Sequence, residues 1–359
     1  MSRLQKFREL LSSRGFDAAI ITDPMNQRYL SGFDFQDGLV VVTVSDTYLL
    51  TDFRYAEAAR EQVVKEIEVV IPSEGQIPCV EALLSSHGAK AVAVEEKHLS
   101  LSEFLRYEKS FCGQKLTGGA SEILCELRLC KDDAELACIE RAQRITDAAF
   151  AHILGRITPE MTEIEVALEL EFFMRREGAE GLAFDTIAVS GTNSARPHGV
   201  PRPVRLEKGF LTMDFGARVD GYCSDMTRTV VLGSADSEMK RLYNTVLCAQ
   251  SAAIDAVAEG TSCLALDKIA RDLINGAGYE GCFGHSLGHG VGMLVHEQPA
   301  LSPRASVESV LHRGHVVTVE PGIYVAGKYG CRIEDMVCIK NDGTAYDFTH
   351  SPKELIELF

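Results

Sequence analysis

Residues 210–232 read FLTMDFGARVDGYCSDMTRTVVL, and the architecture of the second half of the chain can be inferred from them. Two apolar, β-branched runs flank a short polar centre that contains Asp220-Gly221. An Asp-Gly pair between two such runs is a strong signal for a β-hairpin with a tight turn. The stretch therefore predicts two antiparallel strands joined by a short connection.

Asp214 and Asp225 lie on opposite arms of this hairpin. A turn centred on residues 220–221 pairs Asp214 with Thr227. A turn centred one residue earlier pairs it with Asp225. Both registers leave the two carboxylates on one face, since opposed and diagonal partners in a strand pair share a face. A solvent-facing acidic hairpin is the alternative, but the neighbours of Asp214 are apolar, and two such close carboxylates repel each other unless a cation lies between them.

Three further candidate ligands follow in short strand-like or glycine-rich phrases. Glu320 lies in TVEPGIY and Glu334 in CRIED, so they form a second acid pair whose register is left open by the longer loop. His289 lies in the phrase GHSLGHGVG at 284–292, where the glycines make a helix unfavourable. Four carboxylates and one imidazole can hold two divalent ions side by side, and such a pair activates water. A site of oxygens with one nitrogen favours manganese, cobalt, iron or zinc, in an order that affinity rules do not settle. Manganese is our first expectation.

Histidines are concentrated in the same region, at His285, His289 and His296. A single histidine is most often a structural or surface residue, and we interpret the histidines scattered elsewhere in that way. Three histidines this close together instead favour a chemical role. The phrase is not an HExxH zinc helix.

The second half of the chain also repeats itself. One copy runs from Thr162 to Asp214 and the other from Thr261 to Glu320. Each copy begins with a helical pattern, passes through a Gly-x-Glu-Gly turn and ends in a strand that bears an acid. The repetition predicts two similar α/β halves that face each other and contribute acids to a shared centre.

The first 125 residues alternate between helical and extended patterns and contain no cluster of histidine, cysteine or acid motifs. Helical patterns cover 4–14, 55–65 and 80–85, and extended patterns cover 18–22, 38–51, 68–71 and 91–94. The stretch 38–51 reads as two strands that turn at Ser45-Asp46. We interpret this region as a mixed α/β unit for packing or dimerisation, and we expect a homodimer.

A long amphipathic helix is predicted over residues 128–154, where Leu136, Ile139 and Ile145 recur at helical spacing. Here the alternation of helical and extended patterns gives way to one long helical pattern, so we place the domain boundary between Leu124 and Arg128. The expected domains are therefore 1–125 and 126–359.

Composition narrows the classes of function. The 359 residues include 36 basic and 52 acidic side chains, a formal charge of -16 that disfavours nucleic acid and anionic membranes as partners. The 11 cysteines have no CxxC pairs, which fits reduced thiols in a cytosol. The N-terminus lacks an apolar signal core, and no apolar run approaches the roughly 18 residues of a membrane helix. We expect a cytoplasmic protein.

With these phrases assembled, the chain resembles the Xaa-Pro peptidases of the pita-bread metallopeptidase family, which includes proline dipeptidases and aminopeptidases P. The phrase HSLGHGVGMLVHE at 285–297 fits the proline-peptidase signature at every constrained position. The resemblance implies an α/β (α+β) fold. Its pita-bread catalytic domain, with an internal pseudo-two-fold duplication, would follow a smaller creatinase-type N-terminal domain.

The resemblance also implies a role for each ligand. Asp214 would bind one ion, His289 and Glu320 mainly the other, and Asp225 and Glu334 would bridge both. A hydroxide held between the ions would attack the peptide carbonyl, with Glu320 as proton acceptor and donor.

Four more residues receive roles in the same way. His198 and His296 would stabilise the tetrahedral intermediate and contact the substrate. Thr227 and Arg332 would support the ligands from behind, unless they are ordinary strand surface. A structural role is the alternative for each histidine taken alone.

The implied activity is hydrolysis of the peptide bond that precedes proline in short peptides, as an Xaa-Pro dipeptidase or an Xaa-Pro aminopeptidase. The sequence does not separate these two. The alternatives are a methionine-aminopeptidase-like enzyme, a creatinase-like hydrolase without metal, and a non-catalytic pita-bread peptide-binding protein. The presence of all five candidate ligands weighs against the last two.

Overall fold

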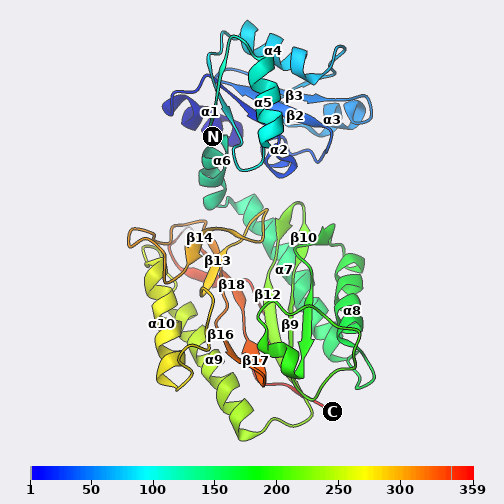
Figure 1. The fold of residues 1–359 in the computed structure, drawn as a ribbon, viewed down its shortest axis with the longest axis vertical. Coiled ribbons are helices and arrows are strands. Elements are labelled where there is room, and N and C mark those ends of the chain that lie inside the picture. The colour runs from blue at the N-terminus through cyan, green and yellow to red at the C-terminus, as the bar shows by residue number, and fades with distance from the viewer. Residues whose placement is uncertain (1, 341) are drawn as a thin grey trace. The chain divides into compact units, whose positions relative to one another are not determined.

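The computed structural model describes residues 2–340 and 342–359. The chain divides into two compact units between Arg128 and Leu129 (Figure 1). None of the described helices is both long and apolar enough to cross a membrane. None of the eleven cysteines, all of which lie in the described part of the chain, forms a disulfide bond.

The first unit is built around a six-stranded sheet with the order β4-β3-β2-β1-β5-β6. Its strands are β1 (Ala18–Ile21), β2 (Gly38–Thr43), β3 (Thr47–Thr51), β4 (Glu68–Val70), β5 (Ala91–Val94) and β6 (Lys115–Gly118). Its helices are α1 (Arg3–Ser13), α2 (Pro24–Ser31), α3 (Ala56–Gln62), α4 (Gln76–Ser86), α5 (Leu101–Ser110) and α6 (Ala120–Leu129). The predicted mixed α/β unit and the strand pair that turns at Ser45-Asp46 are confirmed.

Three helices of this unit, α2, α5 and α6, were not predicted, although α2 and α5 carry start signals in the sequence. Asp23 caps α2, whose first residue is Pro24. Ser100 and Glu103 form a capping box at α5. Both helices are short, so hydrophobic periodicity alone did not reveal them.

The long helix predicted over 128–154 is wrong at its start. Arg128 belongs to α6, which ends at Leu129, and α7 covers Asp133–Leu154. Asp132 begins α7 by accepting the backbone N–H of Glu135, whose side chain accepts the N–H of Asp132 in return. The spacing of apolar residues continues across Asp132, but the capping box there starts a new helix.

The second unit repeats one arrangement twice, as the duplication predicted. Its first half contains α7, α8 (Glu163–Arg176), β7 (Gly181–Leu182), β8 (Ile187–Ser190), the 3-10 helix η1 (Gly191–Ala195), β9 (Gly209–Phe215), β10 (Ala217–Val219), β11 (Tyr222–Cys223) and β12 (Met226–Leu232). Its second half contains α9 (Ser237–Asp255), α10 (Cys263–Gly276), β13 (Gly288–Gly290), β14 (Glu297–Leu301), β15 (Val316–Val319), β16 (Gly322–Val325), β17 (Tyr329–Arg332), β18 (Asp335–Ile339), β19 (Ala345–Asp347) and β20 (Glu357–Leu358).

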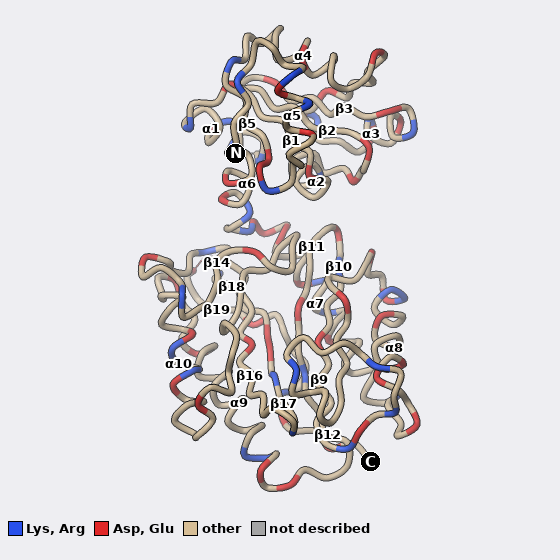
Figure 2. Tube along the Cα trace, in the orientation of Figure 1, with Lys and Arg blue, Asp and Glu red and all other residues tan. Residues whose placement is uncertain are grey.

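The pairing of the strands makes the repetition explicit. In the first half β8, β9 and β12 are successive antiparallel neighbours, and in the second half β13, β15 and β18 are. Helices α7 and α8 pack on the first set, and α9 and α10 on the second, so that the strands lie between the two helix pairs (Figure 1). The outer helices carry charged side chains: on α8 glutamates precede a C-terminal pair of arginines, and α10 carries both acidic and basic residues (Figure 2). The strands thus carry the candidate ligands at the centre of the unit.

The hairpin at residues 210–232 adopts one of the two registers that the sequence left open. Asp214 pairs with Thr227, and Val219 pairs with Tyr222 across the turn. Asp220 and Gly221 both have positive φ, 49° and 85°, as a type I′ turn requires. The turn residues therefore fix which side chains of β9 and β12 share a face.

Candidate active site

A cavity of about 600 Å³ in the second unit brings the candidate residues together. Its lining includes Asp214, Asp225, His289, Glu320, Glu334, His198, His296 and Arg332. Thr227 is fully buried beneath it. The residues that the sequence singled out across 137 positions, from His198 to Glu334, therefore meet in one place.

The first acid pair comes from the β9–β12 hairpin. Asp214 lies on β9, and Asp225 immediately precedes β12. With Asp214 opposite Thr227, Asp225 is the diagonal neighbour of Asp214 on the same face. Asp225 is buried, with 4% of its surface exposed.

The second acid pair occupies the equivalent place in the other half. Val319 pairs with Asp335, and Gly322 pairs with Arg332, so Glu320 and Glu334 lie opposite each other between these two pairs. The structure thereby shows the register of this acid pair, which the longer loop had left open in the sequence. Glu334 is only 1% exposed.

His289 reaches the acids from the short strand β13, which runs between β14 and β15. A Cβ atom on Gly288 would lie 2.0 Å from the carbonyl oxygen of Thr318, and one on Gly290 would lie 2.1 Å from that of Gln298. Only glycine permits this close packing at both positions. The glycines of the phrase therefore serve to bring the imidazole up to the neighbouring strand.

Hydrogen bonding fixes the direction of the His289 ring. Nδ1 lies 3.1 Å from the carbonyl oxygen of Gly290, an acceptor, so Nδ1 carries the proton. Nε2 faces the carboxylates, 3.3 Å from Glu320 Oε1 and 3.7 Å from Asp225 Oδ2. With a cation in the centre, a neutral imidazole held in this way offers Nε2 as the ligand.

The donor set fits divalent cations. Asp225, His289 and Glu334 each offer a ligand atom, and these atoms lie within 4.8 Å of one another. Asp214 Oδ1 is buried and has no hydrogen-bond partner among the described residues. Such an orphaned carboxylate oxygen is costly unless a cation compensates it. Oxygen-rich coordination with a single nitrogen suits manganese, cobalt, iron or zinc.

The pKa values of the acids lead to the same conclusion. Burial raises the pKa of Asp225 well above its usual value, and the charges of Glu334 and Asp214 add to the effect. Burial and the charge of Glu320 likewise raise the pKa of Glu334. These buried groups repel each other when they are ionised, and bound cations would remove that repulsion.

Glu320 behaves differently from the other acids. Burial alone would raise its pKa, but the hydrogen bond and charge of His289 outweigh burial and lower the pKa to about 2. Thr318 Oγ1 also donates to Glu320 Oε1 over 3.3 Å. Glu320 is therefore ionised at neutral pH.

Thr227 and Arg332 connect the acids of the two halves. Thr227 Oγ1 donates to Glu334 Oε2 over 2.6 Å and accepts from Arg332 Nε over 2.9 Å. Arg332 Nη2 donates to Asp214 Oδ2 over 2.6 Å. Both residues are almost fully buried, so they are not ordinary strand surface.

The sequence analysis quoted Tyr324 within TVEPGIY but gave it no role. Its hydroxyl accepts from Arg332 Nη1 over 2.7 Å and lies 3.0 Å from His285 Nε2. His285, which lines the cavity, is thus linked to Arg332 and on to Asp214. The one available signal was that Tyr324 lies only four residues after the candidate ligand Glu320. The sequence alone does not show that its hydroxyl lies beside His285 and Arg332.

Two histidines stand at the open side of the ligands. His198 lies in the loop after η1, and His296 immediately precedes β14. Both are exposed to the cavity, and the rings of His296 and His289 have centroids 4.3 Å apart. They are placed to contact a molecule that enters the cavity.

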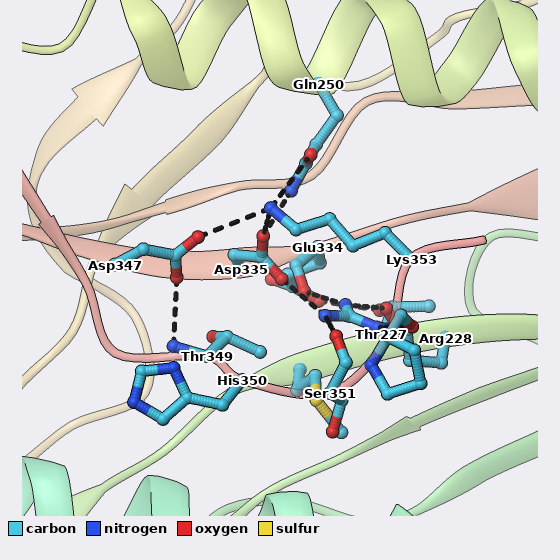
Figure 3. Close-up of polar contacts among 12 residues, drawn as sticks. Thr227, Arg228, Gln250, Glu334, Asp335, Asp347, Thr349, His350, Ser351 and Lys353 are labelled. Carbon is cyan, nitrogen blue, oxygen red and sulfur yellow. Dashed lines mark hydrogen bonds and ion pairs between the residues drawn. The ribbon is translucent and has the colours of Figure 1, made fainter.

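A second layer of charges supports the strands on the face away from the cavity (Figure 3). Asp335 follows Glu334 and pairs with Arg228, which follows Thr227. Lys353 forms an ion pair with Asp335 and lies 3.3 Å from Asp347 Oδ2, while Gln250 Nε2 donates to Asp335 Oδ2 over 2.7 Å. Nothing in the sequence pattern pointed to this cluster, because its members are scattered from position 228 to 353.

Comparison with known families adds to this geometry. Residues 137–341 match the model described as metallopeptidase family M24, and residues 3–130 match the creatinase/prolidase N-terminal domain. The chain belongs to metallopeptidase family M24. This M24 enzyme thus has the two-domain α/β architecture that the sequence predicted, with the metallopeptidase domain second.

Relatives with full-length similarity agree with the family. This M24 metallopeptidase is 36% identical to the Xaa-Pro dipeptidase of Pyrococcus horikoshii, over 99% of this chain and 98% of that protein. The structure of the Xaa-Pro dipeptidase from Bacillus anthracis superposes with a TM-score of 0.94 at 39% identity, covering 99% of both chains. That of the X-Pro aminopeptidase from Thermotoga maritima has a TM-score of 0.90 at 37% identity, covering 97% of this chain and 99% of that one. The resemblance inferred from the sequence is confirmed at the level of the family.

Proposed function

We propose that this enzyme hydrolyses the peptide bond that precedes proline in short peptides, with two divalent metal ions. The observation that carries the proposal is the convergence of Asp214, Asp225, His289, Glu320 and Glu334 on one cavity. The names of the relatives, which are Xaa-Pro dipeptidases and an X-Pro aminopeptidase, support the choice of substrate. We propose manganese as the first candidate for the metal, with cobalt, zinc and iron as alternatives.

Each ligand has a proposed place. Asp214 would hold one ion, His289 and Glu320 mainly the other, and Asp225 and Glu334 both. When bound, the ions would lower the pKa of a water molecule and polarise the peptide carbonyl. The burial of Asp225 and Glu334 supports their bridging role, because a carboxylate shared by two cations loses least by leaving water.

The protein's own groups would move the proton. Glu320, an ionised carboxylate in the cavity, would accept a proton from the attacking water and deliver it to the leaving proline nitrogen. His198 and His296 would donate hydrogen bonds to the carbonyl oxygen as it becomes negatively charged, and would contact the substrate. Thr227 and Arg332 would keep Glu334 and Asp214 in orientation.

The preference for proline has a physical basis. The bond before proline has no N–H to donate, and the ring fixes φ, so general peptidase sites bind it poorly. The cavity offers a largely apolar wall for a ring of this kind. That wall includes Phe184, Ile187, Pro197, Val200 and Val295.

A peptide panel tests the proposal. Xaa-Pro, Xaa-Pro-Yaa and Met-Ala-Yaa peptides are incubated with the purified enzyme, separately with Mn²⁺, Co²⁺, Zn²⁺ or Fe²⁺. Turnover of the first two kinds supports the proposal, and their ratio distinguishes a dipeptidase from an aminopeptidase. Exclusive turnover of Met-Ala-Yaa would identify a methionine-aminopeptidase-like enzyme. Binding of proline peptides without turnover under any metal would identify a peptide-binding protein instead.

We also propose a cytoplasmic homodimer. The apolar strands of the first unit are used in its own core, so they no longer argue for a partner. The unit's exposed apolar side chains include Phe53 and Leu101, which are 82% and 73% exposed, and we propose that they lie at the dimer interface. Light scattering at micromolar concentration would give twice the chain mass for the dimer, and a monomer mass would refute it. The free cysteines support the cytoplasmic setting.

A further inference from the structure

Glu163 is a fully buried carboxylate that is not part of the cavity lining. It is the first residue of α8, yet its side chain does not cap that helix, because Thr162 and Glu165 form the capping box. A buried carboxylate must gain enough hydrogen bonds and opposite charge to offset the loss of hydration. The partners of Glu163 therefore show what it holds.

Those partners lie at the two ends of one loop. At the beginning, Glu163 Oε1 accepts the backbone N–H of Ser190 over 2.8 Å and its hydroxyl over 2.9 Å, and Glu163 Oε2 accepts Asn193 Nδ2 over 3.1 Å. At the end, Glu163 Oε2 accepts the backbone N–H and Nε of Arg202, both over 2.9 Å, while Oε1 accepts Nη2 over 2.8 Å. One carboxylate thus closes the base of residues 190–202.

The loop that is closed in this way carries His198 into the cavity. Pro197, Gly199 and Val200 also line the cavity. At the tip, the carbonyl oxygen of Pro197 accepts Arg332 Nη1 over 3.2 Å. The loop that carries His198 is therefore held at its tip by Arg332 and at its two ends by Glu163.

The charge of Glu163 is maintained at neutral pH. Burial alone would raise its pKa, but the guanidinium of Arg202 and the N–H of Ser190 outweigh burial and lower the pKa below its usual value. Arg202 reaches the carboxylate with two N–H groups, which fixes direction as well as distance. The contact therefore has a fixed geometry, and we refer to the hydrogen-bonded pair of Glu163 and Arg202 as the clasp.

A comparable pair occurs in the second half. Asp267, 1% exposed on α10, accepts the backbone N–H of Leu287 over 3.0 Å and pairs with Arg271. Arg271 donates to the carbonyl oxygens of Phe283 and His285 over 2.7 and 2.8 Å. In both halves, an acid on the second helix and an arginine hold a histidine-bearing segment of the cavity wall.

We propose that Glu163 and Arg202 are positioning residues that set the place of His198 in the active site. This inference rests on the proposed function, in which His198 contacts the reacting peptide. A catalytic group displaced by about 1 Å can cost on the order of 100-fold in rate. Loosening the clasp should therefore lower kcat without removing any metal ligand.

The test compares Glu163→Gln with Glu165→Gln. Gln keeps the shape of Glu163 but removes its charge, and Glu165 is an exposed acid on the same turn whose side chain bonds to Thr162. We expect Glu163→Gln to lower kcat about 10- to 100-fold with KM and bound metal little changed, and Glu165→Gln to leave kcat near the wild-type value. Arg202→Lys, which keeps the charge but not the two-pronged contact, should act in the same direction to a smaller extent.

A double-mutant cycle separates positioning from general damage to the fold. If Glu163 acts through His198, then Glu163→Gln adds little to the loss already caused by His198→Ala. An equal loss of kcat with and without His198, or no loss in Glu163→Gln, would overturn the proposal.

Hydrogen exchange of the loop provides a measurement that does not depend on turnover. Peptides from residues 191–202 should exchange faster in Glu163→Gln than in Glu165→Gln or the wild type. If the wild type cleaves no proline peptide, the proposed function fails, and the loop exchange still decides whether Glu163 holds the loop. Unchanged exchange in Glu163→Gln would refute the clasp itself.

Discussion

Arg228 and Asp335 form an ion pair, 2.7 Å between Nη2 and Oδ1, that is shielded from solvent directly behind the candidate metal ligands. All five N–H groups of Arg228 have acceptors. These acceptors are the Asp335 carboxylate and the carbonyl oxygens of Thr227, Glu334, Ser351 and Pro352. One guanidinium therefore joins the backbone that carries Thr227, the backbone that carries Glu334 and the C-terminal segment.

This arrangement predicts a large loss of stability in Arg228→Met. Removal of one partner leaves Asp335 buried without its main counter-charge, which typically costs about 3–5 kcal/mol. Arg144, which pairs with Glu140 on the surface of α7, provides the control, and Arg144→Met should cost less than about 1 kcal/mol. Urea unfolding measures both, and equal losses would contradict the role assigned to the buried pair.

Thr227→Val should weaken metal binding. Valine keeps the shape of threonine but removes the hydroxyl that donates to Glu334 and accepts from Arg332. Loss of such a supporting contact typically lowers metal affinity about 10- to 100-fold. Thr229→Val, two residues further on the same face of β12, is the matched control, because within the described residues the Thr229 hydroxyl contacts Thr212 and the backbone of Arg332 but none of the five candidate ligands. Titration calorimetry with Mn²⁺ would show the difference, and equal affinities would argue against it.

Asp225→Asn and Glu334→Gln should abolish turnover while the fold remains intact, because each removes a charge proposed to bridge two ions. Each should also raise the melting temperature of the metal-free protein, since the buried carboxylates repel one another there. Thermal unfolding with EDTA and with Mn²⁺ would show that metal stabilises the wild type much more than the variants. Full activity in either variant would mean that the ligand assignment is wrong.

The stability of the protein should fall as the pH drops from 6.5 toward 4, partly because of His315. Burial, together with the nearby charge of Lys131, lowers the pKa of His315 to about 4, so the unfolded chain binds the proton first. His315→Asn preserves an acceptor for the N–H of His312 but removes this titration. Between pH 7 and 4.5 the wild type should lose about 2 kcal/mol more than His315→Asn. His312→Asn, at an exposed neighbour, should follow the wild type in denaturant unfolding over the same range.

The parts of the fold that could be predicted are those determined by residues close together in the sequence. Asp220-Gly221 fixed a hairpin and limited it to two registers, so Asp214 and Asp225 could be placed on one face without a structure. The internal repetition then predicted where Glu320 would lie. The start of α7 was missed because periodicity continues across the capping box at Asp132.

The remaining features depend on contacts between distant residues. The Tyr324 hydroxyl contacts both His285, 39 positions away in the sequence, and Arg332, which lies on the paired strand β17. Glu163 is an unremarkable helical residue in the sequence, and its importance arises from Ser190 and Arg202, which are brought to it by the loop. Side-chain partners separated by 20 or more positions leave no periodic signal, so they could not be anticipated.

The duplicated halves contribute unequal acids. The first half supplies the two aspartates and the second the two glutamates, whose side chains are one methylene longer, and His289 comes from the second half alone. A scaffold with a near two-fold axis would treat both ends of a peptide alike, whereas a peptide has an amino and a carboxyl end. The extra methylenes and the single imidazole make the two halves unequal where the candidate ligands meet. The duplicated domain therefore has a site whose two sides differ, as the two ends of a peptide do.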